Sequence, residues 1–237
     1  MKYIVVDLEM NAIDKINKKE RLICATEVIE IGAVMLDEEY RELSSFKALV
    51  KPQYSPQIWK KFEELTGITT SMVASAPFFE KAFNDFVEWC FNGGKSEEVT
   101  EDKDKDKEEF IVYAWSVSDH QQLSREIKLK KIDVTEKMEQ VLSSFEDFQY
   151  KFTKALKIEK ALSLEQAVDY AGLDFEGRKH DALCDARNTA ELLKMVKNGE
   201  VCSDALKKVK AAVEGEQIAT CLGDKFDFAK LLEGMKK

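Results

Sequence analysis

The sequence predicts a layered α/β domain. Three segments near the N-terminus have the pattern of strands joined by short connections, which is typical of an antiparallel meander. Further along the chain, strands and helices alternate. The 237 residues include only three prolines and ten glycines, and 44% of them are hydrophobic. We therefore expect mostly regular structure around a substantial apolar core.

The strands are predicted by continuous or alternating apolar residues. Residues 2–8 are almost uninterrupted Val, Ile and Tyr, as in a strand buried on both faces. Residues 25–36 and 42–52 form the second and third strands, and Pro52 ends the third. "FIVYAW" at 110–115 is a fourth strand. Residues 12–24 are expected to form a loop that carries a basic cluster.

Helices are predicted where apolar residues recur three and four positions apart. Residues 78–91 show this spacing and end at Gly93-Gly94. Other helices are expected at 58–65, from about 116 onward, over much of 133–158, at 163–173 and at 180–199. Ser163 and Gln166 form a capping box at the start of one of them. "SFEDFQ" is compatible with a short strand inside 133–158.

The charge distribution limits the classes of function. The net charge is −9, which disfavours a broad basic surface for binding duplexes non-specifically. Residues 95–109 form an acidic low-complexity insert, in which "SEEVTEDKDKDKEE" holds eight acids against three lysines. We expect a domain over 1–199 that includes this insert, followed by a helical appendage over 200–237.

The sequence favours a cytoplasmic protein. The apolar runs are shorter than the ~20 residues of a membrane helix, and Asp7 and Glu9 interrupt the first of them, which argues against a signal peptide. The five cysteines are scattered without a CxxC pair. This distribution favours a reducing compartment and predicts neither a disulfide framework nor a zinc site.

Asp7 and Glu9 form the first candidate functional pair. Side chains alternate across a strand, so these two carboxylates point to the same face near its end. Two like charges held together repel each other, and burial increases that cost. A divalent cation would give both a shared partner, with Mg²⁺ or Mn²⁺ suiting oxygen ligands best. The alternative is that the strand has reached solvent and both acids are surface residues.

Asp119 is the second candidate, because it follows the fourth strand directly. Aspartate is also a common helix N-cap. Ser118 competes for that position, since Ser118 and Gln121 fit a capping box. If Ser118 caps the helix, Asp119 lies in the first turn and can project beyond the strand ends.

Asp185 and His180 form the third candidate group. The helix of 180–199 carries an apolar stripe that includes Asp185 among small alanines, which let the helix approach the sheet closely. A buried and unpaired aspartate is costly, so either a metal or a hydrogen-bonding partner in the core must satisfy it. His180 reaches the same site only from the loop before the first turn. A histidine there could exchange protons near neutral pH.

These residues come from three separate segments and together form one chemical set. Four carboxylates and a histidine suit a pair of oxygen-ligated metal ions that clamp a phosphodiester, with the histidine deprotonating the attacking water. The carboxylates are Asp7, Glu9, Asp119 and Asp185.

Five motifs together resemble the DEDDh 3′→5′ exonucleases. They are "VVDLEMN", "EVIEIGAV", "LTGIT", "AWSVSDHQQL" and "GLDFEGRKHDALCDARNTAELL". Within this family they look most similar to the ERI-like and sporulation-inhibitor-like exoribonuclease branch. The resemblance covers about residues 1–198, and it implies a ribonuclease-H-like fold with a five-stranded mixed sheet flanked by helices.

The resemblance also implies roles for the candidate residues. In such enzymes the counterpart of Asp7 bridges two Mg²⁺ or Mn²⁺ ions. The counterparts of Glu9 and Asp185 complete the shell of one ion, and that of Asp119 supports the other. The counterpart of His180 is the general base. Met10 matches a position that often contacts the terminal nucleotide.

Three functions follow as hypotheses. The first is a metal-dependent exonuclease that releases nucleoside 5′-monophosphates from the 3′ end of single-stranded RNA or RNA overhangs. The second is a DNA-directed, proofreading-type exonuclease on the same fold. The third is a non-catalytic adaptor that binds nucleic-acid ends or a protein, which would need neither His180 nor every acid. The basic residues Lys15, Lys18, Lys19 and Arg21 either grip phosphates or form a solvated loop.

Overall fold

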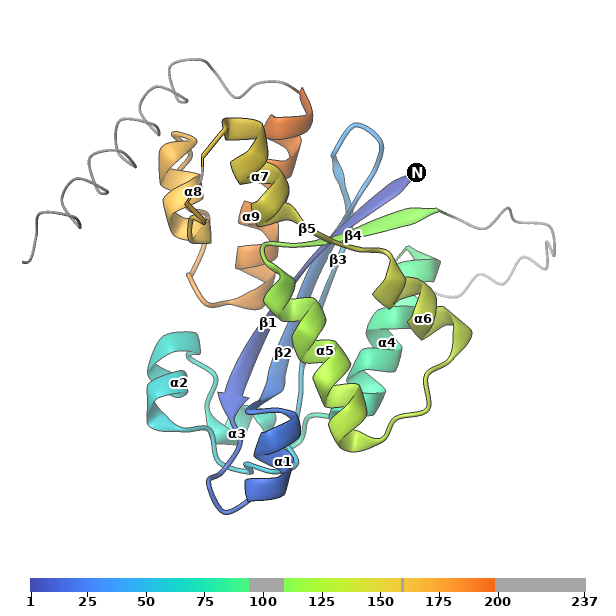
Figure 1. Ribbon diagram of the computed structural model, residues 1–237, viewed down its shortest axis with the longest axis vertical. Coiled ribbons are helices and arrows are strands. Elements are labelled where there is room, and N and C mark those ends of the chain that lie inside the picture. The colour runs from blue at the N-terminus through green and yellow to red at the C-terminus, as the bar shows by residue number, and fades with distance from the viewer. Residues whose placement is uncertain (94–108, 159, 199–237) are drawn as a thin grey trace, which may run out of the picture.

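One mixed sheet forms the centre of the molecule. The computed structural model describes residues 1–93, 109–158 and 160–198 (Figure 1). The strands are β1 (Lys2–Ala12), β2 (Thr26–Leu36), β3 (Glu42–Leu49), β4 (Phe110–Ala114) and β5 (Phe145–Asp147), in the spatial order β3-β2-β1-β4-β5. The β1–β2 and β2–β3 pairs are antiparallel, whereas β1–β4 and β4–β5 are parallel. The predicted five-stranded mixed sheet is confirmed.

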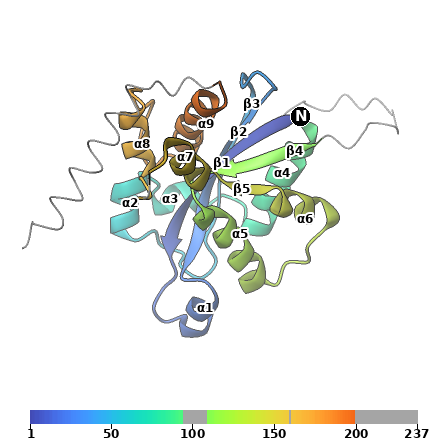
Figure 2. The same ribbon diagram turned by 45° about the horizontal axis from the view of Figure 1, so that its top comes forward.

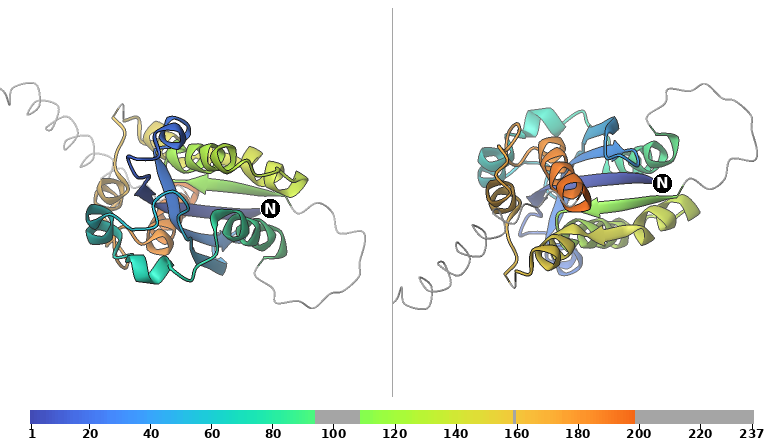
Figure 3. Two further views of the ribbon diagram at one scale, coloured as in Figure 1. Left: turned by 90° about the horizontal axis from the view of Figure 1, so that it is seen from below. Right: turned by 90° about the horizontal axis from the view of Figure 1, so that it is seen from above.

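Helices cover both faces of the sheet. They are α1 (Lys18–Ile23), α2 (Lys60–Thr66), α3 (Thr70–Val73), α4 (Phe79–Asn92), α5 (Val117–Lys130), α6 (Glu136–Ser143), α7 (Phe148–Leu156), α8 (Leu164–Tyr170) and α9 (Ala182–Asn198). Helices α4, α5 and α6 lie on one side, and α7, α8 and α9 lie on the other (Figures 1 and 3).

Alternation along β1 divides the core into two clusters. Ile4, Val6 and Leu8 are buried with the apolar faces of α4, α5 and α6. Val5 lies on the opposite face, with apolar residues of α7, α8 and α9. Successive side chains of a strand point to opposite faces, so the residues that continue the Val5 series, Asp7 and Glu9, lie on the α9 side.

One local prediction was wrong, one helix was not predicted, and one prediction was confirmed. Residues 12–24 are not only loop, because α1 forms within them; it has no buried residue, so apolar periodicity gave no sign of it. The short helix α3 was not expected either. The capping box at α8 is confirmed, since Ser163 accepts a hydrogen bond from the Gln166 amide and the Gln166 side chain accepts one from the Ser163 amide.

The predicted insert and appendage lie largely outside the described residues. Of the insert 95–109, only Glu109 is described, and none of 200–237 is. Both remain sequence predictions. Among the residues that the structure describes, no helix is long and apolar enough to cross a bilayer.

Gly32 lets α9 approach the sheet closely. This glycine lies on β2 directly opposite Asp7. A Cβ built on Gly32 would be 2.2 Å from the Ala182 carbonyl carbon and 2.2 Å from the Leu183 amide nitrogen. Both are backbone atoms at the start of α9, so they can move only if the helix moves. A residue without a side chain is therefore required for α9 to begin beside Asp7.

Gly32→Ala should lower the free energy of unfolding by about 1–3 kcal/mol, because the new methyl group overlaps helix backbone. Urea denaturation measures the loss. Gly172→Ala gives the comparison: no atom lies within 4 Å of its new Cβ, so any loss there reports only the strain of alanine at a φ of 72°, whereas Gly32 has no positive φ and its loss reports the overlap with α9. Unchanged stability in the Gly32 variant would mean that α9 does not lie this close to β2.

Candidate active site

Asp7 and Glu9 lie on the central strand, on the face that α9 covers. Asp7 is partly buried and pairs in register with Gly32. Glu9 is 7% exposed and pairs with Glu30. The two acids are therefore not surface residues beyond the end of the strand, which was the alternative that the sequence left open.

Asp119 lies in the first turn of α5, directly after β4. The N-cap is Ser116, whose hydroxyl accepts a hydrogen bond from the Ser118 amide at 3.3 Å. The expected cap at Ser118 was therefore wrong by two residues. Its consequence holds nevertheless: Asp119 is free of the capping role and is buried, with 5% of its surface exposed.

Asp185 and His180 meet at the N-terminus of α9. His180 lies in the loop before the helix, has a left-handed φ of 59° and is exposed. Its amide donates to Asp185 Oδ2 at 3.3 Å. The prediction that His180 precedes the first turn agrees with this geometry.

The structure brings the separate segments together. One ligand atom from each of Glu9, His180 and Asp185 lies within 4.8 Å of the other two. Asp7 and Asp119 lie within electrostatic range of this group: the charges of Asp119, Asp185 and Glu9 raise the pKa of Asp7, and the charge of Asp119 raises that of Glu9. The five candidates thus converge from β1, α5 and the start of α9.

The pKa values in the cluster show how unfavourable its charges are without a counter-ion. Burial, followed by the charge of Asp185, raises the pKa of Glu9 to about 8. Burial raises the pKa of Asp119 to about 7 and that of Asp185 to about 6. Burial and the neighbouring carboxylates also raise the pKa of Asp7 well above its usual range. Raised values of this kind mark sites that bind cations or protons.

An unsatisfied oxygen supports a cation site. Asp185 Oδ1 is buried and has no hydrogen-bond partner in the structure. Such an atom is costly unless something coordinates it. The donor set consists mainly of carboxylate oxygens, which suits a hard divalent cation, and so the residues present fit a metal site.

Stability should depend on pH in the metal-free protein. A carboxyl group whose folded-state pKa is raised stabilises the fold below its unfolded pKa, and that contribution is lost as the pH rises through the folded value. We therefore expect the melting temperature in EDTA to fall from about pH 4.5 to 8, and Glu9→Gln to reduce this fall. Mn²⁺ should raise the melting temperature more at pH 8 than at pH 5. Differential scanning fluorimetry checks this, and equal slopes in both proteins would contradict it.

A second group of residues supports the site, and the sequence pattern did not predict it. Glu30 is buried, and its Oε2 accepts a hydrogen bond from the Ala182 amide at 3.1 Å. Lys47 Nζ lies 3.4 Å from Glu30 Oε1 and 2.5 Å from Asp181 Oδ2. The Asp181 side chain in turn accepts from the Cys184 amide. This network ties the start of α9 to β2 and β3. A charged residue within the apolar run of 26–36 was the available signal.

Met10 lies apart from the carboxylates. Its side chain is half-buried and packs against the core cluster that contains Leu8. Its contact with a terminal nucleotide stays a prediction from the resemblance.

The sheet order, with acids on the central strand and on two flanking helices, defines the ribonuclease-H-like class. The nuclease domain of 3′hExo, a DEDDh family member solved with rAMP, superposes with a TM-score of 0.67 at 19% identity, over 84% of this chain and 92% of that one. Cell-death related nuclease 4 superposes with a TM-score of 0.63 at 23% identity, over 84% and 64% of the two chains.

The sequence comparison gives the family. The sequence model described as "Exonuclease" matches residues 4–193, and the chain therefore belongs to the DEDDh 3′→5′ exonuclease family. Mouse ERI1 exoribonuclease 2 is 29% identical over 190 residues, which is 73% of this chain and 26% of the relative. Rat 3′-5′ exoribonuclease 1 is 26% identical over 179 residues, or 73% and 48%. The chain thus matches between a quarter and a half of the length of these relatives.

Proposed function

We propose that this protein is a metal-dependent 3′→5′ exonuclease that shortens single-stranded RNA or RNA 3′ overhangs and releases nucleoside 5′-monophosphates. The observation that carries the proposal is the convergence of Glu9, His180 and Asp185 within 4.8 Å, bordered by Asp7 and Asp119. Family membership makes the same reaction the expected one. The names of the mouse and rat relatives favour RNA over DNA.

Asp7, Glu9, Asp119 and Asp185 would hold two divalent cations, Mg²⁺ or Mn²⁺. Bound there, the cations would acidify the attacking water and neutralise charge on the phosphate. A metal site of this kind also explains the costly charge density on one face of β1. Asp7 is central to it, since the charges of Glu9, Asp119 and Asp185 all raise its pKa.

His180 is the proposed general base. It takes a proton from the water that attacks the terminal phosphorus, while the bond to the 3′ oxygen of the preceding nucleotide breaks. Two observations support this role over a structural one. The side chain is exposed and lies in a loop, so it can exchange protons with solvent, and its ring reaches the carboxylate cluster.

The direct test compares single-stranded RNA and DNA oligonucleotides of one sequence, labelled at the 5′ end. We expect a ladder that shortens from the 3′ end with Mg²⁺ or Mn²⁺, nucleoside 5′-monophosphates as products and no turnover in EDTA. Faster degradation of the DNA would favour the proofreading-type alternative. Binding of a 3′ end that is never shortened, even with Mn²⁺, would contradict the enzymatic proposal and favour an adaptor.

A further inference from the structure

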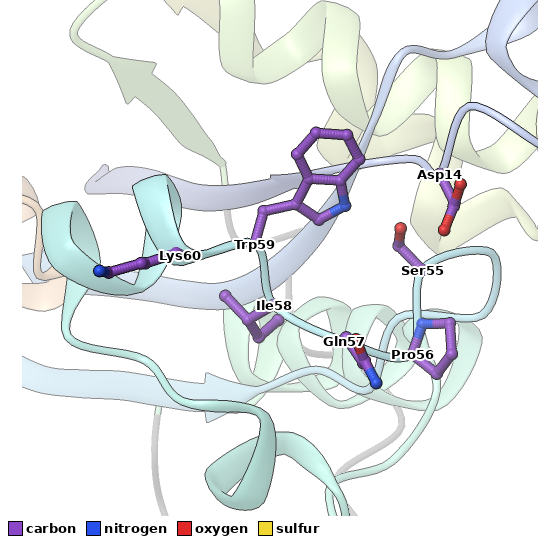
Figure 4. A pocket seen from close by; sticks show the side chains of 7 residues that line it. All are labelled: Asp14, Ser55, Pro56, Gln57, Ile58, Trp59 and Lys60. Carbon is purple, nitrogen blue, oxygen red and sulfur yellow. The ribbon is translucent and has the colours of Figure 1, made fainter.

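An open pocket lies beyond the C-terminal end of β1. It has a volume of about 610 Å³ and is lined by Asp14 and by the segment Ser55–Lys60. In Figure 4 the Trp59 indole stands up from this segment, with Asp14 and Ser55 facing each other beside it. We call this feature the Trp59 pocket. The proposed catalysis makes no use of it.

Buried polar side chains hold the segment that forms the pocket. Glu27 is fully buried, and its carboxylate accepts hydrogen bonds from the amides of Gln53, Tyr54 and Ser55 at 2.7, 2.8 and 3.1 Å. Lys130 Nζ lies 3.1 Å from Glu27 Oε1 and balances its charge. A buried carboxylate that accepts hydrogen bonds from three successive loop amides fixes the path of that loop.

Asn11 connects the same segment to the strand of the active site. Its side chain is fully buried, donates to the Gln57 carbonyl at 3.1 Å and accepts from the Trp59 amide at 3.1 Å. Asn11 follows Glu9 by two residues on β1, which is about 7 Å along a strand and on the same face. The backbone of Trp59 is therefore tied to the strand that carries Glu9, two residues beyond it.

The Trp59 ring is partly exposed at the surface. Trp59 is 36% exposed, although its amide donates to Asn11 Oδ1 and the preceding Ile58 amide donates to Thr70 Oγ1. A tryptophan that serves only the core would be covered. An exposed aromatic ring on a backbone held by hydrogen bonds is the kind of platform on which nucleic-acid bases stack.

Unpaired basic side chains lie next to the pocket. Asn17, which precedes α1, donates to the Tyr54 carbonyl at 2.6 Å and so ties α1 to the loop of the pocket. Lys15, Lys18 and Lys19 are exposed, and no described residue forms an ion pair with any of them. Figure 2 shows α1 standing out beyond the end of β1. This chemistry fits a polyanion better than an apolar protein surface.

We propose that the Trp59 pocket binds the nucleotides that precede the 3′-terminal one in a single-stranded nucleic acid. A base stacks on Trp59, the polar rim of Asp14 and Ser55 contacts its edge or the sugar, and the phosphates run along Lys15, Lys18 and Lys19. The inference rests on the proposed exonuclease function and extends it: the protein grips the strand upstream of the bond that it cuts. Binding of a partner protein to the same surface is the alternative, and the test below distinguishes it from binding of nucleic acid.

The test compares two substrates. One is a single-stranded RNA oligonucleotide, which reaches the pocket. The other is the p-nitrophenyl ester of thymidine 5′-monophosphate, which has no preceding nucleotide. For Trp59→Ala we expect KM for the oligonucleotide to rise at least about fivefold with kcat kept, and the ester to be hydrolysed at the wild-type rate. Trp59→Phe should restore most of the loss.

The lysines are tested by the dependence of binding on salt. In Lys18→Ala/Lys19→Ala, the slope of log affinity against log salt concentration should decrease in magnitude by about 1.4, as expected for two lost phosphate contacts to a single strand. The matched controls are Tyr150→Ala and Lys154→Ala/Lys157→Ala, which change an exposed aromatic residue and two exposed lysines on α7 and at its C-cap, at the opposite end of the molecule from α1 (Figure 1).

The outcomes separate this inference from the proposed function. If wild-type protein cleaves neither substrate, the proposed function fails and the inference fails with it. If wild-type protein is active and the Trp59 and lysine variants match their controls on the oligonucleotide, the inference alone is overturned, and a protein partner becomes the better occupant. Loss of ester hydrolysis in Trp59→Ala would also overturn it, because the residue would then act on the catalytic site.

Discussion

Replacing Asp7 by asparagine should reduce the rate of RNA hydrolysis at least ~10²-fold while raising the melting temperature of the metal-free protein. Both effects have one cause. Asp7 lies within electrostatic range of four acidic side chains, and each of their charges raises its pKa. Removing its charge takes away a metal ligand, which costs activity, and also takes away repulsion, which favours the fold.

The opposite signs make this prediction specific. A residue that only supports the structure would lose activity and stability together. Single-turnover kinetics with Mn²⁺ measures the first effect, and thermal unfolding in EDTA measures the second. Asp85→Asn is the control, since Asp85 is exposed on α4 and pairs with Lys81. An Asp7→Asn protein that keeps its activity, or that melts at a lower temperature in EDTA, would contradict the assignment.

Replacing His180 by alanine should lower kcat at least ~10²-fold with little change in the affinity for Mn²⁺. The reason is that His180 is proposed to move a proton rather than to hold a cation. His120 is the matched control, because it is the second of the two histidines in the chain and its ring packs 5.1 Å from that of Phe145.

The pH dependence distinguishes a base from a positioning residue. Wild-type kcat should rise with pH as the general base loses its proton, and the His180→Ala variant should lose that limb of the profile. A variant with the same profile at a lower rate would indicate that His180 only positions its neighbours. If the His180→Ala variant keeps the wild-type kcat, His180 takes no part in the chemistry.

Local sequence pattern was enough to predict four of the strands, whereas the five-stranded mixed sheet was implied by the family resemblance. The continuous apolar run of β1 and the alternation in β2 specify strands, and a two-residue period specifies that Asp7 and Glu9 share a face. The stripe of small residues on α9 predicted a close approach to the sheet, and Gly32 shows how close that approach is.

The supporting residues could not be predicted in the same way, because they depend on register and on loop paths. Glu30 lies beside Glu9 only once β2 is aligned with β1. Asn11 and Glu27 gain their roles from the loop of 53–59, whose path nothing in the local sequence specifies. Helix α1 was missed because it buries no side chain, so its sequence carries no apolar stripe.

The central claim is that carboxylates from β1, α5 and α9 share divalent cations at which a polynucleotide 3′ end is hydrolysed. Crystals soaked with Mn²⁺ and a nucleoside 5′-monophosphate test it most directly, through anomalous scattering from the manganese. We predict two manganese peaks in contact with Asp7, with the phosphate of the nucleotide bound between them and His180. A bound nucleotide with no manganese at Asp7, or manganese bound only elsewhere, would contradict the account.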